Sequence, residues 1–134
     1  MSCPCQSGEE YQGCCEPYHR GELPKEALPL MRSRYSAYAK GVVDYIIDTT
    51  HPDNSQYLQD HKLWRKQLKE FCDNTDFLGL EIHEEVVGEK VSFVTFKAKL
   101  RQNGQDAGFT ERSRFEKTGG RWLYHSGEFI PIVI

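Results

Sequence analysis

The hydrophobic pattern of this 134-residue chain changes its period once, near the middle. Up to residue 73 the apolar residues recur at steps of three and four, as on one face of a helix, whereas later they alternate with polar residues, as in a strand. Helices followed by a run of hairpin-linked strands are typical of α+β folds, in which helices cover one face of a curved antiparallel sheet. The sequence therefore predicts one compact α+β domain.

Three helices are predicted in the first half. The first begins near Leu28 and is interrupted at Gly41, and its stripe consists of Leu28, Met31, Tyr35 and Tyr38. A second, short helix in "VVDYIIDTTHP" ends near His51, because Pro52 disfavours the helical conformation in the residue before it. The third spans about residues 60–73, with Trp64, Leu68 and Phe71 on one face.

The second half predicts a meander of four antiparallel strands. Turn residues separate the strands at 88–90, 103–104 and 119–120. The alternating residues are Leu78, Leu80 and Ile82, then Val94, Phe96, Ala98 and Leu100, then Phe109 and Phe115, then Trp122 and Tyr124. A short fifth strand is a further option at "FIPIV", residues 129–133.

The charge balance narrows the classes of partner. The net charge is -3 and the sequence pI about 5.9, so no basic field draws the chain to nucleic acid or to an anionic membrane. No stretch approaches the roughly 20 consecutive apolar residues of a membrane span, and the first twenty residues lack the apolar core of a secretory signal. We therefore expect a cytoplasmic protein that binds neither nucleic acid nor membrane.

Four of the five cysteines lie in "SCPCQSGEEYQGCC", residues 2–15. Disulfides require an oxidising compartment, and bonds within the Cys3/Cys5 or Cys14/Cys15 pairs would strain the main chain, although pairing across them stays open. A catalytic thiol needs an activating group, which His19 can supply, but one nucleophile does not need four thiols.

A structural zinc site does need four ligands. Pro4, Gly8 and Gly13 can shape the two turns that bring Cys3, Cys5, Cys14 and Cys15 together. A segment too short for its own core then folds mainly because metal binding supplies the energy. The sequence therefore predicts Zn²⁺ on four sulfurs, with His19 as the alternative ligand.

Two sets of motifs resemble known families. "CPCQSGEEYQGCC" resembles the SEC-C motif, a zinc-binding knuckle with the pattern C-x-C, eight residues, then C-C or C-H. "YHRG", "LMRSRYSAYAKG", "YIIDTTHP" and "ERSRFEKTGGRWLYHSGE" together are similar to the YchJ-like family of bacterial proteins, over nearly the whole chain. The resemblance implies a knuckle at residues 1–21 and a nuclear transport factor 2-like domain at residues 22–134, with three helices and a cone-shaped sheet around a cavity.

The knuckle departs from its family in charge. SEC-C knuckles commonly carry lysines between the cysteine pairs, whereas this chain has Glu9, Glu10 and Gln12 there. In the preprotein translocase ATPase such a knuckle binds an acidic export chaperone, which basic residues suit. Added carboxylates would repel that partner, so chaperone binding does not transfer to this chain.

The cone interior has its own candidate residues. Alternation places Phe109, Glu111, Ser113 and Phe115 on one strand face, so that a carboxylate lies between two phenyl rings and needs a partner if it is buried. Arg32 and Arg34 border the first helix's stripe and can form a structural ion pair with it. Alternatively, Glu111 or His51 moves a proton while an arginine holds an anionic substrate. Tyr35, Trp64, Trp122 and Tyr124 belong to that pocket or simply to the core.

Two functions follow from these observations. The first is an adaptor or binding module that contacts a protein partner through its zinc knuckle. The second is an enzyme of the lyase or isomerase type that acts on a small molecule inside the cone. A solvent-connected cavity next to Glu111 favours the enzyme, and a filled core sealed by an arginine favours the adaptor. Monomer and dimer remain equally open.

Overall fold

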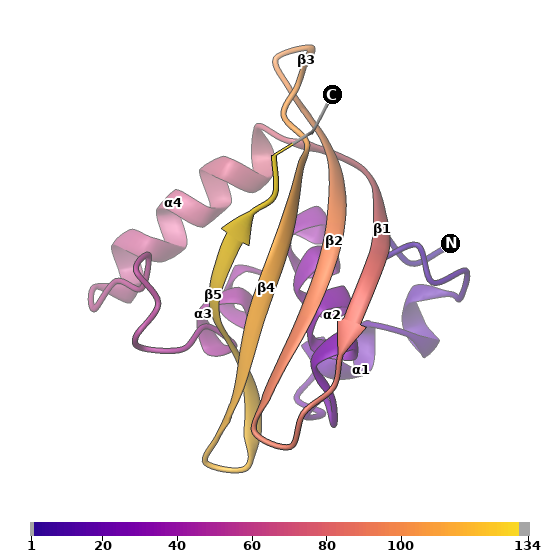
Figure 1. The fold of residues 1–134 in the computed structure, drawn as a ribbon. Coiled ribbons are helices and arrows are strands. Elements are labelled where there is room, and N and C mark those ends of the chain that lie inside the picture. Colours follow the sequence, from indigo (N-terminus) through magenta and orange to yellow (C-terminus); the bar gives the residue numbers. More distant parts are fainter. Residues whose placement is uncertain (1, 132–134) are drawn as a thin grey trace.

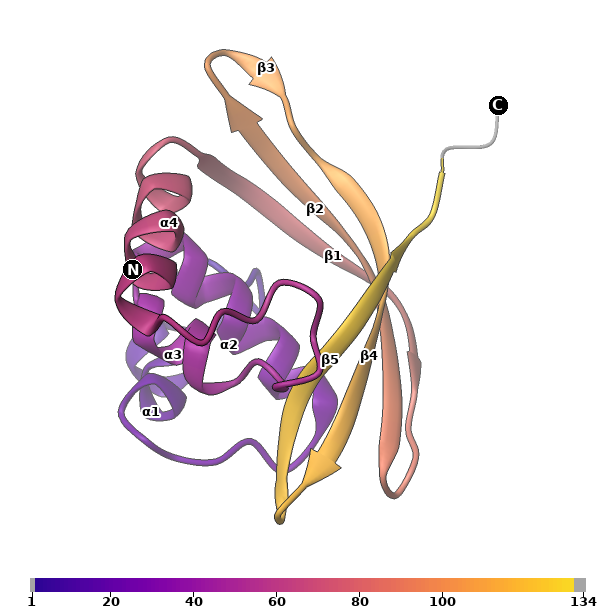
Figure 2. The same ribbon diagram turned by 90° about the vertical axis from the view of Figure 1, so that its left-hand side faces the viewer.

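The computed structural model of the chain describes residues 2–131. Its centre is an antiparallel sheet that curves around the helices, all of which lie on one side of it (Figures 1 and 2). The predicted α+β architecture is confirmed. No helix within residues 2–131 has the length and apolarity needed to cross a membrane.

Helix α2 (Ala27–Lys40) is the central helix of the fold. It ends where predicted, because Gly41 takes the left-handed conformation (φ 73°) that closes a helix at little cost. Its burial is wider than a single stripe, since Leu30, Ser33 and Ser36 are also inaccessible to solvent. The physical reason is that α2 is covered on two sides, by the sheet and by the N-terminal residues.

Two further helices follow as predicted. Helix α3 (Val43–Asp48) ends three residues before His51, with Thr49 as its C-cap. Helix α4 (His61–Asp73) begins at Asp60, whose carboxylate accepts a hydrogen bond from the Leu63 amide. Of the predicted α4 stripe only Trp64 is buried, because this helix lies beside an open cavity.

The four long predicted strands are confirmed. They are β1 (Asp76–Val86), β2 (Val91–Gln102), β4 (Phe109–Thr118) and β5 (Arg121–Phe129), in the spatial order β1-β2-β4-β5. A two-residue strand that the pattern does not predict, β3 (Gln105–Asp106), pairs with the end of β2. Asn103 and Gly104 form the turn between them, both with positive φ, as a tight hairpin requires.

Two details of the strand prediction are wrong or untested. Leu78 is 48% exposed instead of facing the core, because the register shifts between Phe77 and Gly79 and reverses the alternation. At "FIPIV", Phe129 ends β5 and the next two residues form no strand, while residues 132 and 133 lie outside the described part of the chain.

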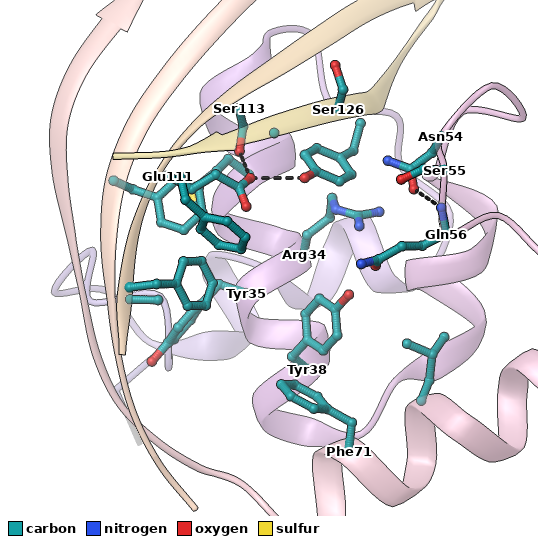
Figure 3. Close-up of a pocket in the computed structure, with 18 of the residues that line it drawn as sticks. Arg34, Tyr35, Tyr38, Asn54, Ser55, Gln56, Phe71, Glu111, Ser113 and Ser126 are labelled. Atoms are coloured by element: carbon teal, nitrogen blue, oxygen red, sulfur yellow. Dashed lines mark hydrogen bonds between the residues drawn. The ribbon is translucent and has the colours of Figure 1, made fainter. Parts of the chain in front are cut away.

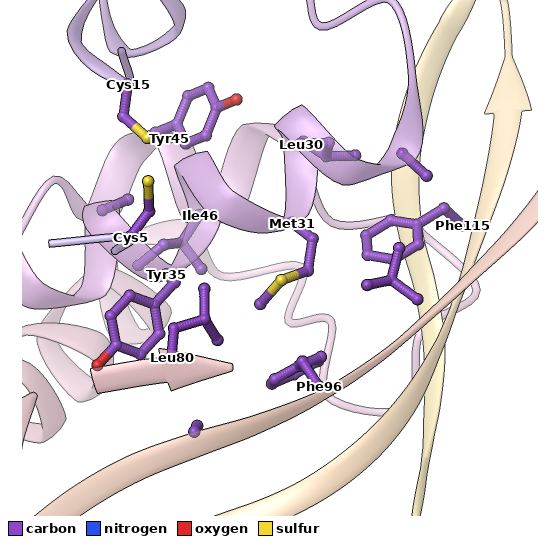
Figure 4. Close-up of a cluster of buried hydrophobic side chains, with 14 of the residues drawn as sticks. Cys5, Cys15, Leu30, Met31, Tyr35, Tyr45, Ile46, Leu80, Phe96 and Phe115 are labelled. Atoms are coloured by element: carbon purple, nitrogen blue, oxygen red, sulfur yellow. The ribbon is translucent and has the colours of Figure 1, made fainter. Parts of the chain in front are cut away.

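The N-terminal residues pack onto α2 and belong to the same apolar core as the sheet. They contain a 3-10 turn (Tyr11–Gly13) and helix α1 (Glu16–His19). Figure 4 shows Cys5 and Cys15 on one side of α2, with Phe96 and Phe115 of the sheet on the other. The division into residues 1–21 and 22–134 stays a prediction.

The position of Phe115 yields a stability prediction. Phe115 is 1% exposed, so Phe115→Ala should lower the free energy of unfolding by about 3–5 kcal/mol. Phe129→Ala is the matched control, because Phe129 is 68% exposed and its loss should cost less than about 1 kcal/mol. Chemical denaturation followed by circular dichroism measures both values. Equal losses would contradict the core described above.

Candidate functional sites: a cysteine cluster and the cavity of the cone

The chain reverses direction between the two cysteine pairs. The Cys3 amide donates to the Glu9 carbonyl (2.8 Å), and Ser2 and Glu10 form an isolated antiparallel bridge. The 3-10 turn then leads directly into Cys14 and Cys15 at the start of α1. This reversal brings both pairs to the surface of α2.

The four sulfurs form one cluster whose dimensions suit a metal ion. All four lie within 4.8 Å of one another, with 3.6 Å between Cys5 and Cys14 and 3.9 Å between Cys14 and Cys15. A tetrahedral site with metal–sulfur bonds of about 2.3 Å has sulfur–sulfur edges of about 3.8 Å. All five cysteines of the chain are free thiols, so neither pairing within the cluster nor pairing across it is formed. The cluster is compatible with metal binding.

Hydroxyl groups support the sulfurs. Ser36 of α2 lies 3.3 Å from the sulfurs of both Cys3 and Cys15, and Ser7 lies 3.2 Å from that of Cys14. Hydrogen bonds to thiolates offset their negative charge and orient them toward a metal. Within the cluster a hydrogen bond between Cys15 and Cys5 lowers the pKa of Cys5 and raises that of Cys15. This hydrogen bond therefore favours the thiolate form of Cys5.

His19 supports the cysteine cluster from outside it. Its Nε2 donates to the Ser33 carbonyl (2.8 Å), so that Nδ1 is free to accept from the Tyr11 hydroxyl (2.7 Å). Burial lowers the pKa of His19, which keeps the ring neutral for both bonds. With both nitrogens engaged, His19 connects the N-terminal segment to α2.

Arg32 also contacts the N-terminal cysteine segment and does not reach the interior of the cone. Its Nη1 donates to the carbonyl of Cys5 (2.7 Å), on the knuckle side of α2. The prediction that Arg32 could line a pocket or pair with Glu111 is therefore wrong. The reason is helical geometry, because two residues along a helix move the side chain by about 200° around the axis.

A cavity of about 830 Å³ lies between the concave face of the sheet and helices α2 and α4. Its size falls in the range of about 300–1,000 Å³ typical of small-molecule sites. Aromatic rings form much of its wall, and a loop with Asn54, Ser55 and Gln56 borders it opposite Glu111 (Figure 3). Five of the predicted residues line this cavity: Arg34, Tyr35, Trp64, Glu111 and Tyr124.

Glu111 is 9% exposed and is held by neutral hydroxyl groups. Ser113 and Tyr124 both donate to the same oxygen, Oε2, the latter over 3.0 Å. Burial, followed by the nearby carboxylate, raises the pKa of Tyr124, so that its hydroxyl stays protonated and donates. Figure 3 shows the second carboxylate oxygen pointing away from both donors. This arrangement leaves Oε1 available to a ligand.

Arg34 is 8% exposed and is anchored by α3, not by Glu111. Its Nη1 donates to the Ile46 carbonyl (3.1 Å) and to the hydroxyls of Thr49 (2.8 Å) and Thr50 (3.1 Å). Its guanidinium also stacks on the ring of Tyr124, at 4.7 Å from the centroid. The predicted ion pair between an arginine and Glu111 does not form among the described residues, because a tyrosine lies between the two charges.

Two predicted pocket residues lie elsewhere. The amide of His51 donates to the carbonyl of Tyr124 along the edge of β5, and its ring lies 5.0 Å from that of His125, outside the cavity lining. Trp122 is buried, and its Nε1 donates to the carbonyl of Lys25 (3.1 Å), in the segment that leads into α2. His51 is therefore not positioned to share a proton with Glu111, and Trp122 is a structural residue.

Two residues of the cavity are not indicated as pocket residues by the sequence pattern. The pattern places Tyr38 on the helix stripe, but Tyr38 lines the cavity and burial raises the pKa of its hydroxyl. Gly127 lies against the Glu111 carboxylate and the Tyr124 hydroxyl, so closely that a β-carbon there would collide with both. A glycine inside a strand indicates that another group approaches the backbone closely, and this is the sequence signal that could point to the contact with Glu111.

Comparison with known proteins identifies relatives over most of the chain. The family described as "YchJ, middle NTF2-like domain" matches residues 26–127. A UPF0225 protein of Serratia proteamaculans is 42% identical over 130 residues, which cover 93% of this chain and 81% of the relative. A UPF0225 protein of Vibrio parahaemolyticus is 39% identical over 131 residues, covering 96% of this chain and 75% of the relative.

The matches to solved structures extend over the cysteine segment as well. The solution structure of a SEC-C motif containing protein from Rhodopseudomonas palustris matches with a TM-score of 0.83 and 33% identity, over 98% of this chain and 100% of the other. A SEC-C motif containing protein from Psychrobacter arcticus matches with a TM-score of 0.78 and 27% identity, over 98% and 84%. A Mycobacterium tuberculosis LEH-like epoxide hydrolase, at 16% identity and a TM-score of 0.57 over 80% and 86% of the chains, shares the fold alone.

The tight contact at Gly127 predicts a specific defect. Gly127→Ala should displace the carboxylate of Glu111 and the hydroxyl of Tyr124, and should destabilise the protein by about 1–3 kcal/mol. Gly79→Ala is the matched strand control, because a β-carbon there meets only the flexible side chain of Lys99, at 3.4 Å. Thermal unfolding and the side-chain NMR signals of Tyr124 measure the effect. An unchanged Tyr124 environment in Gly127→Ala would contradict the described packing.

Proposed function

The chain belongs to the YchJ family of bacterial proteins with a middle NTF2-like domain, and from this premise we propose that it is a zinc-binding protein whose cone binds a small molecule. The observation that carries the second part is the position of Glu111. Its carboxylate lies in a large, largely aromatic cavity with one oxygen left for a ligand.

The donor set supports zinc at the knuckle. Four thiolates at tetrahedral spacing are a preferred environment for Zn²⁺, and structural sites of this kind leave no open position for chemistry. The similar proteins of known structure are described as SEC-C motif containing proteins. Cys3, Cys5, Cys14 and Cys15 would hold the ion, which would act as a structural cross-link.

The role of the ion follows from where the knuckle packs. The Cys3/Cys5 pair and the Cys14/Cys15 pair are joined by few main-chain hydrogen bonds, so a common metal would link them more strongly than the backbone does. Three of the four cysteines are buried against α2. Zinc would thereby fix the knuckle on the face of α2 opposite the sheet.

The cone offers what a small-molecule site requires. It combines a largely apolar wall with polar groups that include Glu111, Arg34 and the hydroxyl of Tyr38. Of the two alternatives derived from the sequence, an open cavity beside Glu111 favours the small-molecule function. In an enzyme of the isomerase type, Glu111 Oε1 would accept a proton from the ligand and return it to another atom of the same ligand.

A protein partner is a second candidate, favoured by one observation. The knuckle segment from Gln6 to Glu10 is exposed, whereas the opposite side of the knuckle is buried against α2. The carboxylates of Glu9 and Glu10 would suit a basic surface on such a partner. Loss of a partner in a Glu9→Lys, Glu10→Lys variant with an unchanged cone would support this function.

The zinc proposal predicts a metal content. Purified protein should contain about one zinc per chain, and Cys14→Ser should lose it, together with the hydrogen-exchange protection of residues 2–21. Amides of the sheet should stay protected. Cys72→Ser is the control, because Cys72 lies outside the cluster and its replacement should leave the zinc in place. Metal-free wild-type protein with an ordered knuckle would contradict the proposal.

The functional role of Glu111 predicts an unusual stability result. Both partners of Glu111 are neutral hydroxyls, and the amide of Gln can accept the same two hydrogen bonds. Since burying a charge is costly, Glu111→Gln should leave the free energy of unfolding unchanged or raise it by about 1 kcal/mol. Ser113→Ala, which removes one hydrogen bond, should lower it by about 1 kcal/mol. A loss above about 2 kcal/mol in Glu111→Gln would indicate a structural carboxylate instead.

A further inference from the structure

The cavity of the cone contains two opposite charges that do not neutralise each other. Arg34 and Glu111 are both buried, and neither forms an ion pair with any group in residues 2–131. Their hydrogen-bond partners are hydroxyls and a carbonyl, which carry no charge. Buried charges without a counter-charge are costly, and a bound ligand can supply what each one lacks.

Each charged group has one side engaged and one side turned to the cavity. The hydrogen bonds of Arg34 to Ile46, Thr49 and Thr50 all come from Nη1, and its side chain also hydrogen-bonds to the hydroxyl of Tyr38, which lines the cavity. Figure 3 shows the guanidinium between Glu111 on one side and Gln56 on the other. On Glu111 both hydrogen bonds end on Oε2. The ligand therefore meets a donor edge of Arg34 and an acceptor oxygen of Glu111.

Tyr124 sets the separation between the two charges. Its hydroxyl lies 3.0 Å from Glu111 Oε2, and its ring centroid lies 4.7 Å from the guanidinium carbon of Arg34. One ring thus touches both groups, so Arg34 and Glu111 lie on neighbouring parts of the cavity wall. A small ligand that carries both an acceptor and a donor can contact both.

We propose that the cone binds a 2-amino or 2-hydroxy carboxylic acid with an apolar side chain. The carboxylate lies on Arg34, whose planar guanidinium matches two carboxylate oxygens, and the amino or hydroxyl group donates to Glu111 Oε1. This inference rests on the proposed small-molecule function of the cone and names its ligand class.

The apolar part of the cavity wall determines which side chain the ligand carries. Beyond the polar groups the wall is apolar, and its rings include Phe96, Phe109 and Phe115 of the sheet and Phe71 and Trp64 of α4. An aromatic or branched aliphatic side chain would bury its surface there. The volume of about 830 Å³ accommodates a side chain of benzyl size and larger ones.

Four probes that share a phenethyl body test the two polar contacts separately. L-phenylalanine carries the carboxylate and an amino group, L-3-phenyllactate carries the carboxylate and a hydroxyl, 3-phenylpropanoate carries the carboxylate alone, and 2-phenylethylamine carries the amine alone. Their affinities for the zinc-loaded full chain are measured by isothermal titration calorimetry and ligand-detected NMR. Phenylalanine or phenyllactate should bind at least about tenfold more tightly than either single-group probe, and the stronger of the two identifies the donor.

Variants assign each contact to its residue. Glu111→Gln should reduce the advantage of the better two-group probe over 3-phenylpropanoate by about tenfold, while 3-phenylpropanoate itself binds as before or better. Arg34→Lys should weaken all three carboxylates by a similar factor. Arg112→Lys is the control, because Arg112 stacks on Phe93 and does not line the cavity, so all affinities should stay unchanged. If Arg34→Lys does not fold, the effect of Glu111→Gln on the probe affinities still tests the proposed ligand class.

Several outcomes would overturn the ligand class. If neither phenylalanine nor phenyllactate binds more tightly than 3-phenylpropanoate, and Glu111→Gln changes none of these affinities, the contact with Glu111 is refuted. Equal binding of phenylalanine and 2-phenylethylamine would refute the contact with Arg34. Failure of all four probes rejects the class, and 1-anilinonaphthalene-8-sulfonate then separates the two proposals. If that dye shifts amide signals of the cavity-lining strands, the small-molecule function stands without this ligand class, and if it shifts none, both fail.

Discussion

The structure depends on the burial of helix α2 from two opposite sides. A surface helix normally buries one stripe and exposes the rest, but α2 places Met31 and Tyr35 toward the sheet, Ser36 toward the cysteines of the knuckle and Ser33 toward Tyr45 of α3. Small hydroxyl residues suit the second side, because they allow close approach and hydrogen-bond to sulfur and carbonyl groups. The knuckle thereby completes the core of the cone.

This two-sided packing links the cysteine cluster to the cavity. Ser33, to whose carbonyl His19 donates, forms a 2.7 Å hydrogen bond with the hydroxyl of Tyr45 in α3. The next residue, Arg34, hydrogen-bonds to the end of the same helix. The knuckle therefore supports the two helices that hold the guanidinium in place. A metal bound at the cysteine cluster would in this way contribute to the order of the cavity without touching it.

The opposite wall of the cavity is ordered by close packing within the sheet. Glu111 and Ser113 face inward from β4, and Gly127 of β5 leaves room for the carboxylate because it has no side chain. Tyr124 then reaches over to donate to Glu111 and to support Arg34. Three neighbouring elements thus hold two opposite charges in one cavity without an ion pair between them, so the proposed ligand would need little rearrangement of the protein to contact both.

The sequence by itself determined the order of helices and strands, the grouping of four cysteines and the place of Glu111 on the same strand face as Phe109 and Phe115, because these follow from local periodicity and spacing. Only the tertiary structure decided which groups Glu111 meets. Arg32 and Arg34 both border one helical stripe, yet they separate to the knuckle and to the cavity, since the second side of α2 is covered by residues distant in sequence. The shift at Leu78 and the position of His51 likewise depend on pairing between segments distant in sequence, which no local pattern encodes. Gly127 signals a close approach in the sequence, but only the tertiary structure shows that the approaching groups are Glu111 and Tyr124.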